Sequence, residues 1–322
     1  MRFLLTITIL FSLAVVANGQ SFSTEPIRKV TLPLEVRQEL SASYEIPDEI
    51  KGKVWNRWTS ENFTVLSLND TQAQYLHKHL ELVKVWVFSR WGLYDMPFSA
   101  ECKLICVDDP ELYEKMFKIN STQVEIRRQN SGPDSQNDWE NKIEESVIFV
   151  LINDDPSRTI PLPLTEVCLA EFARNYQQQF PWWAVRGMSL LNGSLDQIRS
   201  NFNEFVPVVT QNRNVYFTKG LFNMTKDKYV VLDEAHKHLY DQCAMTLCLM
   251  LRKEFGQNLF HKFLNKSSIV SSDDALVDVL GFQGNDDFDR TFRRYMIDLM
   301  NDVKNNKTPN SYLQIQEAGL DD

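Results

Sequence analysis

The residues with the most chemical interest lie together in one segment, residues 164–190. Glu171 follows Ala170 in this segment, and Arg174 and Arg186 come after it. On a helix, imidazoles at the first and fifth positions of such a stretch lie one turn apart on one face, and a glutamate beside the first activates a zinc-bound water. Only the glutamate of that arrangement is present here.

Two stretches of this segment resemble the active-site motifs of the peptidase MA-like (gluzincin-type) metallopeptidases. Residues 170–174, with the letters AEFAR, stand where that family has H-E-x-x-H. Residues 181–189, with the letters PWWAVRGMS, are similar to the P-x-W-x-x-E-G-x-A stretch that carries the family's third ligand, a carboxylate. The order of the expected helices and strands continues the likeness over roughly residues 55–300.

The resemblance implies an α+β, gluzincin-like fold, in which a small mixed β-sheet packs on helices and a mainly helical C-terminal part follows. It assigns the former metal positions to Ala170, Arg174 and Arg186. An alanine methyl group has no donor atom, and an arginine side chain stays protonated in proteins and cannot coordinate a cation. We therefore expect no metal and no cofactor. We interpret the chain as a degenerate family member, a pseudo-metallopeptidase rather than an enzyme.

The resemblance also places the vestigial Glu171 near one or both guanidinium groups of Arg174 and Arg186. A buried glutamate between two arginines would form a structural ion pair in place of the metal. Trp182 and Trp183 adjoin the former cleft. They are expected either to pack in the core or, for one of them, to line a groove that binds an extended peptide or another protein.

One alternative is that segment 164–190 has no relation to a peptidase site. Its first part would then be an ordinary amphipathic helix with four residues on its apolar face. These residues are Leu169, Phe172, Ala173 and Tyr176. Under this interpretation the chain is an envelope or surface structural protein.

A second alternative is a working hydrolase that uses other residues. Its metal ligands could be relocated to Glu234, His238 and Cys243, which lie close together on an expected helix. Cys168 could instead act as a nucleophile with a distant histidine, although a cysteine on an apolar helix is usually packed in the core.

The composition excludes one class of partner. The net charge of -9 and the pI near 5.2 do not favour nucleic-acid binding, which needs clustered basic residues to displace counterions from phosphates. The hydrophobic fraction of 43% is enough for a normal core. The chain has 5 cysteines, an odd number, so at least one cannot form an intramolecular disulfide.

The N-terminus has the form of a secretory signal, with Arg2 before an apolar run and small residues before Gln20. We therefore predict a signal peptide at residues 1–19 and a secreted or periplasmic location, with no membrane-spanning segment after its removal. If the source is a eukaryote, the sequons predict glycosylation. They lie at Asn62, Asn69, Asn120, Asn192, Asn223, Asn265 and Asn306.

Hydrophobic periodicity and turn signals set out the expected elements. Strands are expected at residues 63–68, 102–107 and 146–152, and helices at residues 71–91, 110–117, 165–176 and 233–254. Thr165 is the expected N-cap of the altered active-site helix, and the polar residues 119–142 are expected to form a mobile insertion. The predicted organisation is an extended lead-in at 20–54, a sheet-containing subdomain at 55–200, a helical subdomain at 201–301 and a disordered tail at 302–322.

Overall fold

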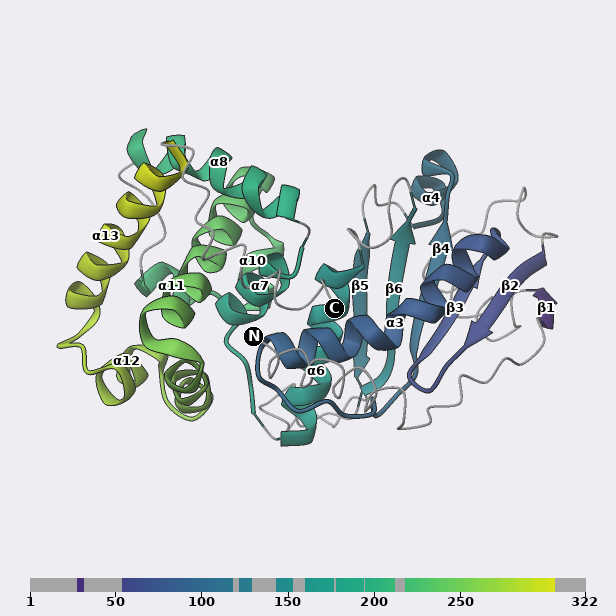
Figure 1. The fold of residues 1–322 in the computed structure, drawn as a ribbon, viewed down its shortest axis with the longest axis horizontal. Helices are drawn as coiled ribbons and strands as arrows, with labels where there is room; N and C mark the ends of the chain where they lie inside the picture. Colours follow the sequence, from purple (N-terminus) through teal and green to yellow (C-terminus); the bar gives the residue numbers. More distant parts are fainter. Residues whose placement is uncertain are drawn as a thin grey trace, which may run out of the picture.

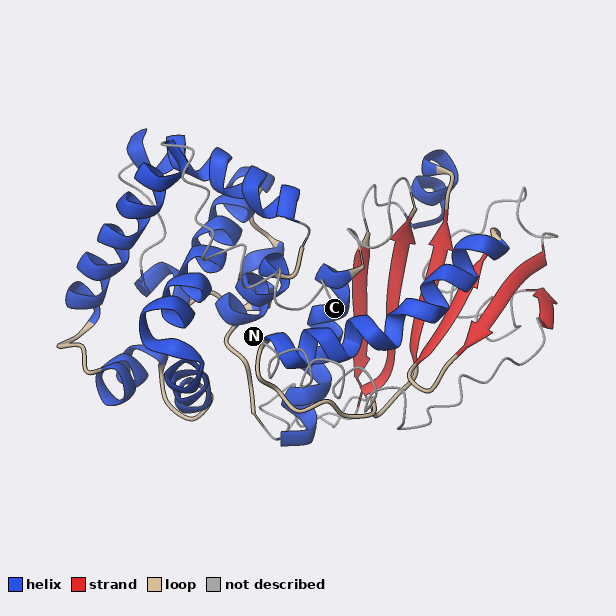
Figure 2. Ribbon diagram, in the orientation of Figure 1, coloured by secondary structure: helices blue, strands red, loops and turns tan. Residues whose placement is uncertain are grey.

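A computed structural model describes most of the chain, in eight ranges. These ranges are residues 28–31, 54–117, 122–128, 143–152, 160–176, 178–193, 195–211 and 218–304. They form a mixed α+β fold with a sheet-containing part and a helical part (Figures 1 and 2). The predicted signal peptide, most of the lead-in and most of the predicted tail lie outside the described residues.

One six-stranded sheet has the strand order β1-β2-β3-β4-β6-β5. Its strands are β1 (Arg28–Thr31), β2 (Val54–Thr59), β3 (Phe63–Ser67), β4 (Cys102–Val107), β5 (Gln123–Arg128) and β6 (Ile143–Leu151). The central strands β3, β4 and β6 are parallel, whereas the outer pairs β1–β2, β2–β3 and β5–β6 are antiparallel. The sheet is mixed, as predicted.

Ten described helices accompany the sheet. They are α3 (Asp70–Arg90), α4 (Pro110–Phe117), α6 (Pro161–Tyr176), α7 (Trp182–Leu191), α8 (Leu195–Gln211), α9 (Thr218–Phe222), α10 (Lys226–Val230), α11 (Glu234–Ser267), α12 (Ser272–Leu280) and α13 (Asn285–Lys304). α3 joins the parallel strands β3 and β4, because a parallel pair needs a crossover connection. From α6 onwards every described element is a helix.

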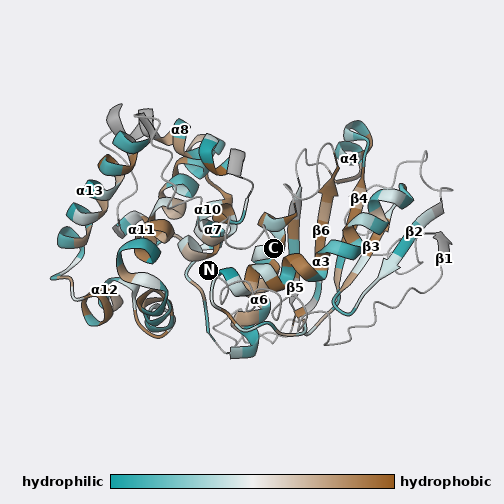
Figure 3. Ribbon diagram, in the orientation of Figure 1, coloured by the Kyte–Doolittle hydropathy of each residue, from teal (hydrophilic) through white to brown (hydrophobic). Residues whose placement is uncertain are grey.

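Apolar side chains cover both faces of the sheet. Val65, Leu104 and Ile148 share one core with α3 and α6. Alternate residues such as Ile105 and Phe149 point to the opposite face, where α4 covers them. Buried parallel strands are expected to be apolar on both sides, and Figure 3 shows hydrophobic residues along β4 and β6.

Helix α11 is interrupted by a break at Gly256. Asp233 caps its start by accepting a hydrogen bond from the backbone N–H of His236 at 2.9 Å. Gly256 interrupts the helix with φ 75°, a left-handed conformation that costs glycine little. The helix was expected to end at residue 254, just before this glycine. Instead, the helix resumes after it and continues to Ser267.

The helix expected at residues 165–176 begins one turn earlier in the structure. α6 starts at Pro161, and Thr165 is not its N-cap: the Thr165 hydroxyl donates to the Pro161 carbonyl at 2.6 Å. Pro161 and Pro163 are tolerated because the N–H groups of a first helical turn have no intrahelical partner.

Four parts of the predicted organisation also differ from the structure. Strand β5 lies within the predicted insertion, where it pairs with β6, and strand β1 lies within the predicted lead-in, where it pairs with β2. The boundary between residues 200 and 201 falls inside α8. The predicted tail begins three residues too early, because α13 runs to Lys304.

All five cysteines are buried and none forms a disulfide. The prediction that they act as small hydrophobic core residues is confirmed. Two sequon asparagines, Asn62 and Asn192, are also buried and hydrogen-bonded, so the packing around them leaves no space for a glycan. Asn223 and Asn265 are exposed.

None of the helices in the described ranges has both the length and the apolar character needed to cross a membrane.

Candidate functional site

Two of the three positions that the resemblance assigned to a metal, Ala170 and Arg174, lie with Glu166 on one stripe of α6. Glu166, Ala170 and Arg174 follow one another at four-residue spacing, so a helix places them on one side. All three are partly exposed, whereas the neighbouring Cys168 and Glu171 are buried. The stripe is therefore the side of α6 that is not packed into the main core.

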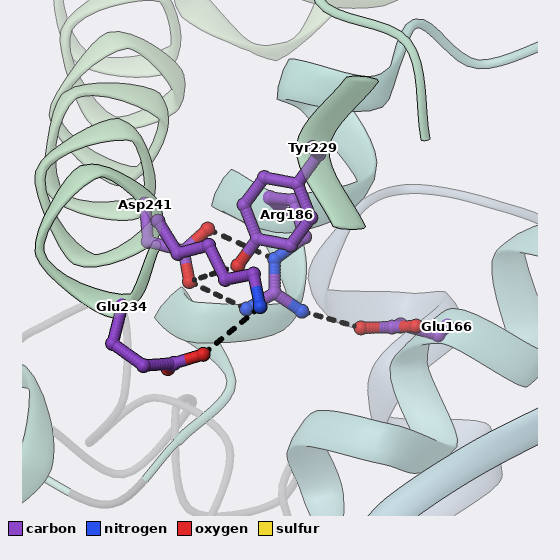
Figure 4. Close-up of polar contacts among 6 residues, drawn as sticks. Glu166, Arg186, Tyr229, Glu234 and Asp241 are labelled. Carbon is purple, nitrogen blue, oxygen red and sulfur yellow. Dashed lines mark hydrogen bonds and ion pairs between the residues drawn. The ribbon is translucent and has the colours of Figure 1, made fainter. Parts of the chain in front are cut away.

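Arg186 reaches this stripe from α7. Its Nη1 donates to Glu166 Oε1 at 2.7 Å, one helical turn before Ala170. Its Nε and Nη2 donate to the two carboxylate oxygens of Asp241 on α11, at 2.9 and 2.6 Å. Figure 4 shows the guanidinium between these two acids. Arg186 thus links α6, α7 and α11 by two ion pairs, one of them bidentate.

Aromatic rings enclose the same guanidinium. Its central carbon lies 5.2 Å from the centre of the Tyr229 ring and 6.0 Å from that of Trp182. The Tyr229 hydroxyl donates to Asp241 at 2.9 Å. The ammonium of Lys226 lies 5.9 Å from the Trp182 ring. Cation–π contacts of this kind add to the ion pairs because a ring face attracts a cation.

Electrostatics favour the charged form of Arg186 and the neutral form of Tyr229. Burial disfavours the charge of Arg186, but the charge and hydrogen bonds of Asp241, together with Glu166, raise its pKa above the ordinary arginine value. Burial also raises the pKa of Tyr229, so its hydroxyl remains a donor. Side-chain exposure is 15% for Arg186, 12% for Glu166 and 14% for Asp241, so water screens the ion pairs only partly.

The predicted ion pair between Glu171 and an arginine is wrong for Arg186, and no described contact joins Glu171 to Arg174. Glu171 Oε2 accepts hydrogen bonds from the backbone N–H and the hydroxyl of Ser99, at 2.9 and 2.7 Å. Its other carboxylate oxygen is buried without a partner. The reason is geometric. Positions 170 and 171 of a helix point ~100° apart, so a group that contacts the stripe of Ala170 does not face Glu171.

The two tryptophans of the Pro-Trp stretch have different surroundings. Trp183 is fully buried, and its ring lies 5.7 Å from that of Phe222 and 5.8 Å from that of Phe263. Core packing is therefore confirmed for Trp183. Trp182 is partly buried, and its ring meets the Tyr229 ring edge-on at 5.5 Å. Of the two, only Trp182 lies beside the Arg186 network.

The residues proposed for a relocated metal site do not converge. His238 Nε2 contacts Glu204 at 3.0 Å and Gln242 at 2.8 Å, while Cys243 is buried. Glu234 pairs with Lys237 at 2.9 Å (Figure 4). Within the described ranges no group of three or more His, Cys, Asp and Glu side chains is arranged to hold a metal ion.

Cys168 is placed poorly for nucleophilic chemistry. The side chain is completely buried, and burial raises the pKa of its thiol well above the ordinary value. A nucleophilic cysteine needs the opposite, an exposed thiol whose pKa is lowered by a positive neighbour.

Sequence reasoning missed the partners of Arg186. Glu166 could have been predicted as a partner, because Glu166 precedes Ala170 by one helical turn and so lies on the same side of the helix. Asp241 lies 55 residues after Arg186, and no local pattern connects the two.

No family model matches this chain, and neither does any curated protein with which it was compared.

Proposed function

We propose that this chain is an exported, non-hydrolytic protein with a peptidase-like arrangement that acts as a binding or structural module. The observation that carries the proposal is the double ion pair of Arg186 with Glu166 and Asp241. In the resembled family the position of Arg186 belongs to a metal-binding carboxylate. Here a permanent cation occupies it, and two carboxylates neutralise that cation.

The chemistry of this arrangement argues against hydrolysis. A zinc ion beside a guanidinium would meet electrostatic repulsion instead of coordination. Glu171 is fully buried and bonded to Ser99, so it has no access to a substrate water. Ala170 contributes no donor atom. Arg186, Glu166 and Asp241 therefore have the role of a structural link between helices α6, α7 and α11. We call these three residues the Arg186 clamp.

The partner that the proposal favours is a peptide or a protein. Trp182 is partly exposed beside the clamp and packs against the buried Tyr229. A partly exposed aromatic side chain can contribute apolar area to the binding of an extended chain. A peptidase-like scaffold without zinc can hold such a chain without cleaving it.

A peptide-library assay tests the proposal. We expect the purified chain to leave an unbiased peptide library intact after long incubation, while a working zinc peptidase run in parallel cleaves it. Cleavage that co-elutes with the folded chain would contradict the proposal. In that case, loss of cleavage in Glu171→Gln or in Cys168→Ala would assign the activity to one of these two residues.

A further inference from the structure

Two arginines near the junction of α3 and α11 lie within reach of each other's charge and have no acidic partner among the residues that the structure describes. Arg90 is the last residue of α3, with 8% of its surface exposed, and Arg252 lies on α11 and is partly exposed. Within the described residues no carboxylate forms an ion pair with either of them. A buried charge without a counter-ion is unusual, because an ion loses its hydration when it is buried.

The hydrogen bonds of Arg90 and Arg252 are also incomplete. Arg90 Nη2 donates to the carbonyl of Leu191, the last residue of α7, at 2.8 Å. The negative end of a helix dipole favours a cation there. However, Arg90 Nε and Nη1 and Arg252 Nη1 are buried and have no hydrogen-bond partner in the described part of the chain. Buried N–H groups of this kind are nearly always satisfied in folded proteins, by protein, water or an ion.

Aromatic rings surround the pair. The central guanidinium carbon of Arg252 lies 5.2 Å from the centre of the Trp91 ring, and that of Arg90 lies 5.0 Å from the centre of the Trp86 ring. On the same side, His261 Nε2 hydrogen-bonds with the Trp91 carbonyl. Burial lowers the pKa of His261, so the ring favours the neutral form and does not add a third full charge.

The two guanidinium groups destabilise each other. Burial and then the charge of Arg252 lower the pKa of Arg90 to about 9. Burial lowers the pKa of Arg252 as well. In a chain with a net charge of -9, this local excess of positive charge stands out. An anion placed between the groups would remove the repulsion and accept the unpaired N–H groups.

The geometry points to an oxyanion-binding site at Arg90 and Arg252 that takes a carboxylate or phosphate group. Arg252, the more exposed of the two, contacts the anion, and its planar fork suits two oxygen atoms of one group. Arg90 supplies the second positive charge, and its hydrogen bond to the Leu191 carbonyl fixes the position of its guanidinium. The site lies at the ends of α3 and α7, apart from the Arg186 clamp, and does not depend on the proposed function.

Thermal unfolding in the presence of anions tests this site. Sodium phosphate and sodium acetate are titrated separately at constant ionic strength, with chloride making up the difference. We expect the Tm of the native chain to rise saturably with one or both anions, by roughly 5 °C at a hundredfold excess over Kd. The anion that saturates at the lower concentration identifies the preferred group.

Two variants separate the site from general salt effects. Arg252→Gln should lose the saturable rise, and its Tm in chloride alone should equal or exceed that of the native chain, because one of two repelling cations is gone. Arg294→Gln, an exposed arginine on α13, should keep the rise. The proposal is overturned if neither anion raises the Tm saturably, if Arg252→Gln responds like the native chain, or if Arg252→Gln is unfolded or less stable in chloride.

Discussion

Replacement of Arg186 by leucine is expected to lower the free energy of unfolding by about 3–5 kcal/mol, the usual cost of removing one member of a buried ion pair. Asp241 would lose its bidentate partner and Glu166 its hydrogen bond. Both carboxylates are at most 14% exposed, so water cannot fully replace the guanidinium. Urea denaturation followed by circular dichroism measures the change.

A double-mutant cycle distinguishes the clamp from a simple loss of packing. Asp241→Leu alone should also destabilise the chain, because it leaves Arg186 short of a partner. Arg186→Leu combined with Asp241→Leu should cost clearly less than the sum of the two single changes, because little unpaired charge remains. Arg294→Leu serves as the matched control and should shift stability by no more than ~0.5 kcal/mol. Strictly additive effects of the two clamp changes would refute the clamp.

Gly187→Ala is expected to destabilise the chain by about 2–3 kcal/mol, even though alanine normally favours a helix over glycine by ~1 kcal/mol. A Cβ atom at this position would lie 2.4 Å from the Ala244 carbonyl oxygen and 2.5 Å from Cys248 Sγ. Helices α7 and α11 would therefore have to move apart. Urea denaturation again gives the size of the effect.

The close contact at Gly187 predicts a partial rescue. Cys248→Ala removes the sulfur atom but leaves the Ala244 carbonyl in place. Gly187→Ala combined with Cys248→Ala should therefore be more stable than additivity predicts, yet less stable than Cys248→Ala alone. A stability of Gly187→Ala equal to or above that of the native chain would show that α7 and α11 do not pack as tightly as the structure has them.

Periodic elements with clear ends could be predicted from the sequence. Strand β4 and helix α4 occupy the expected residues, and Asp233 caps α11 as expected. Such elements depend on local signals: alternation, a 3.6-residue repeat and a capping side chain. These elements agree with the α+β class, because strands and helices share the first half of the chain and the described elements after β6 are all helices.

Elements that depend on a distant partner were harder to predict. Strand β5 lies in a polar stretch and is defined by its pairing with β6. The bond of Glu171 to Ser99 joins a helix to a loop 72 residues away. The Arg186–Asp241 pair joins two helices 55 residues apart. Local patterns carry no information on such contacts, since they form only when the whole chain is packed.

The site positions that the resemblance assigned remain a prediction. Arg186 contacts Glu166, one helical turn before Ala170 on α6, but no described contact joins Arg186 to Ala170 or Arg174. The acid that neutralises Arg186 was assigned wrongly to Glu171, although Glu166 follows from the helical repeat alone. An expectation built on the letters of a motif did not identify the counter-ions of Arg186.

The zinc content of the purified chain tests the central claim most directly. After expression in zinc-supplemented medium and gel filtration, elemental analysis gives the molar ratio of zinc to protein. The account predicts a ratio far below one, because Ala170 and the two arginines offer no ligand and Arg186 is held by Glu166 and Asp241. A ratio near one that falls when Glu166 or Glu171 is changed to glutamine would contradict it.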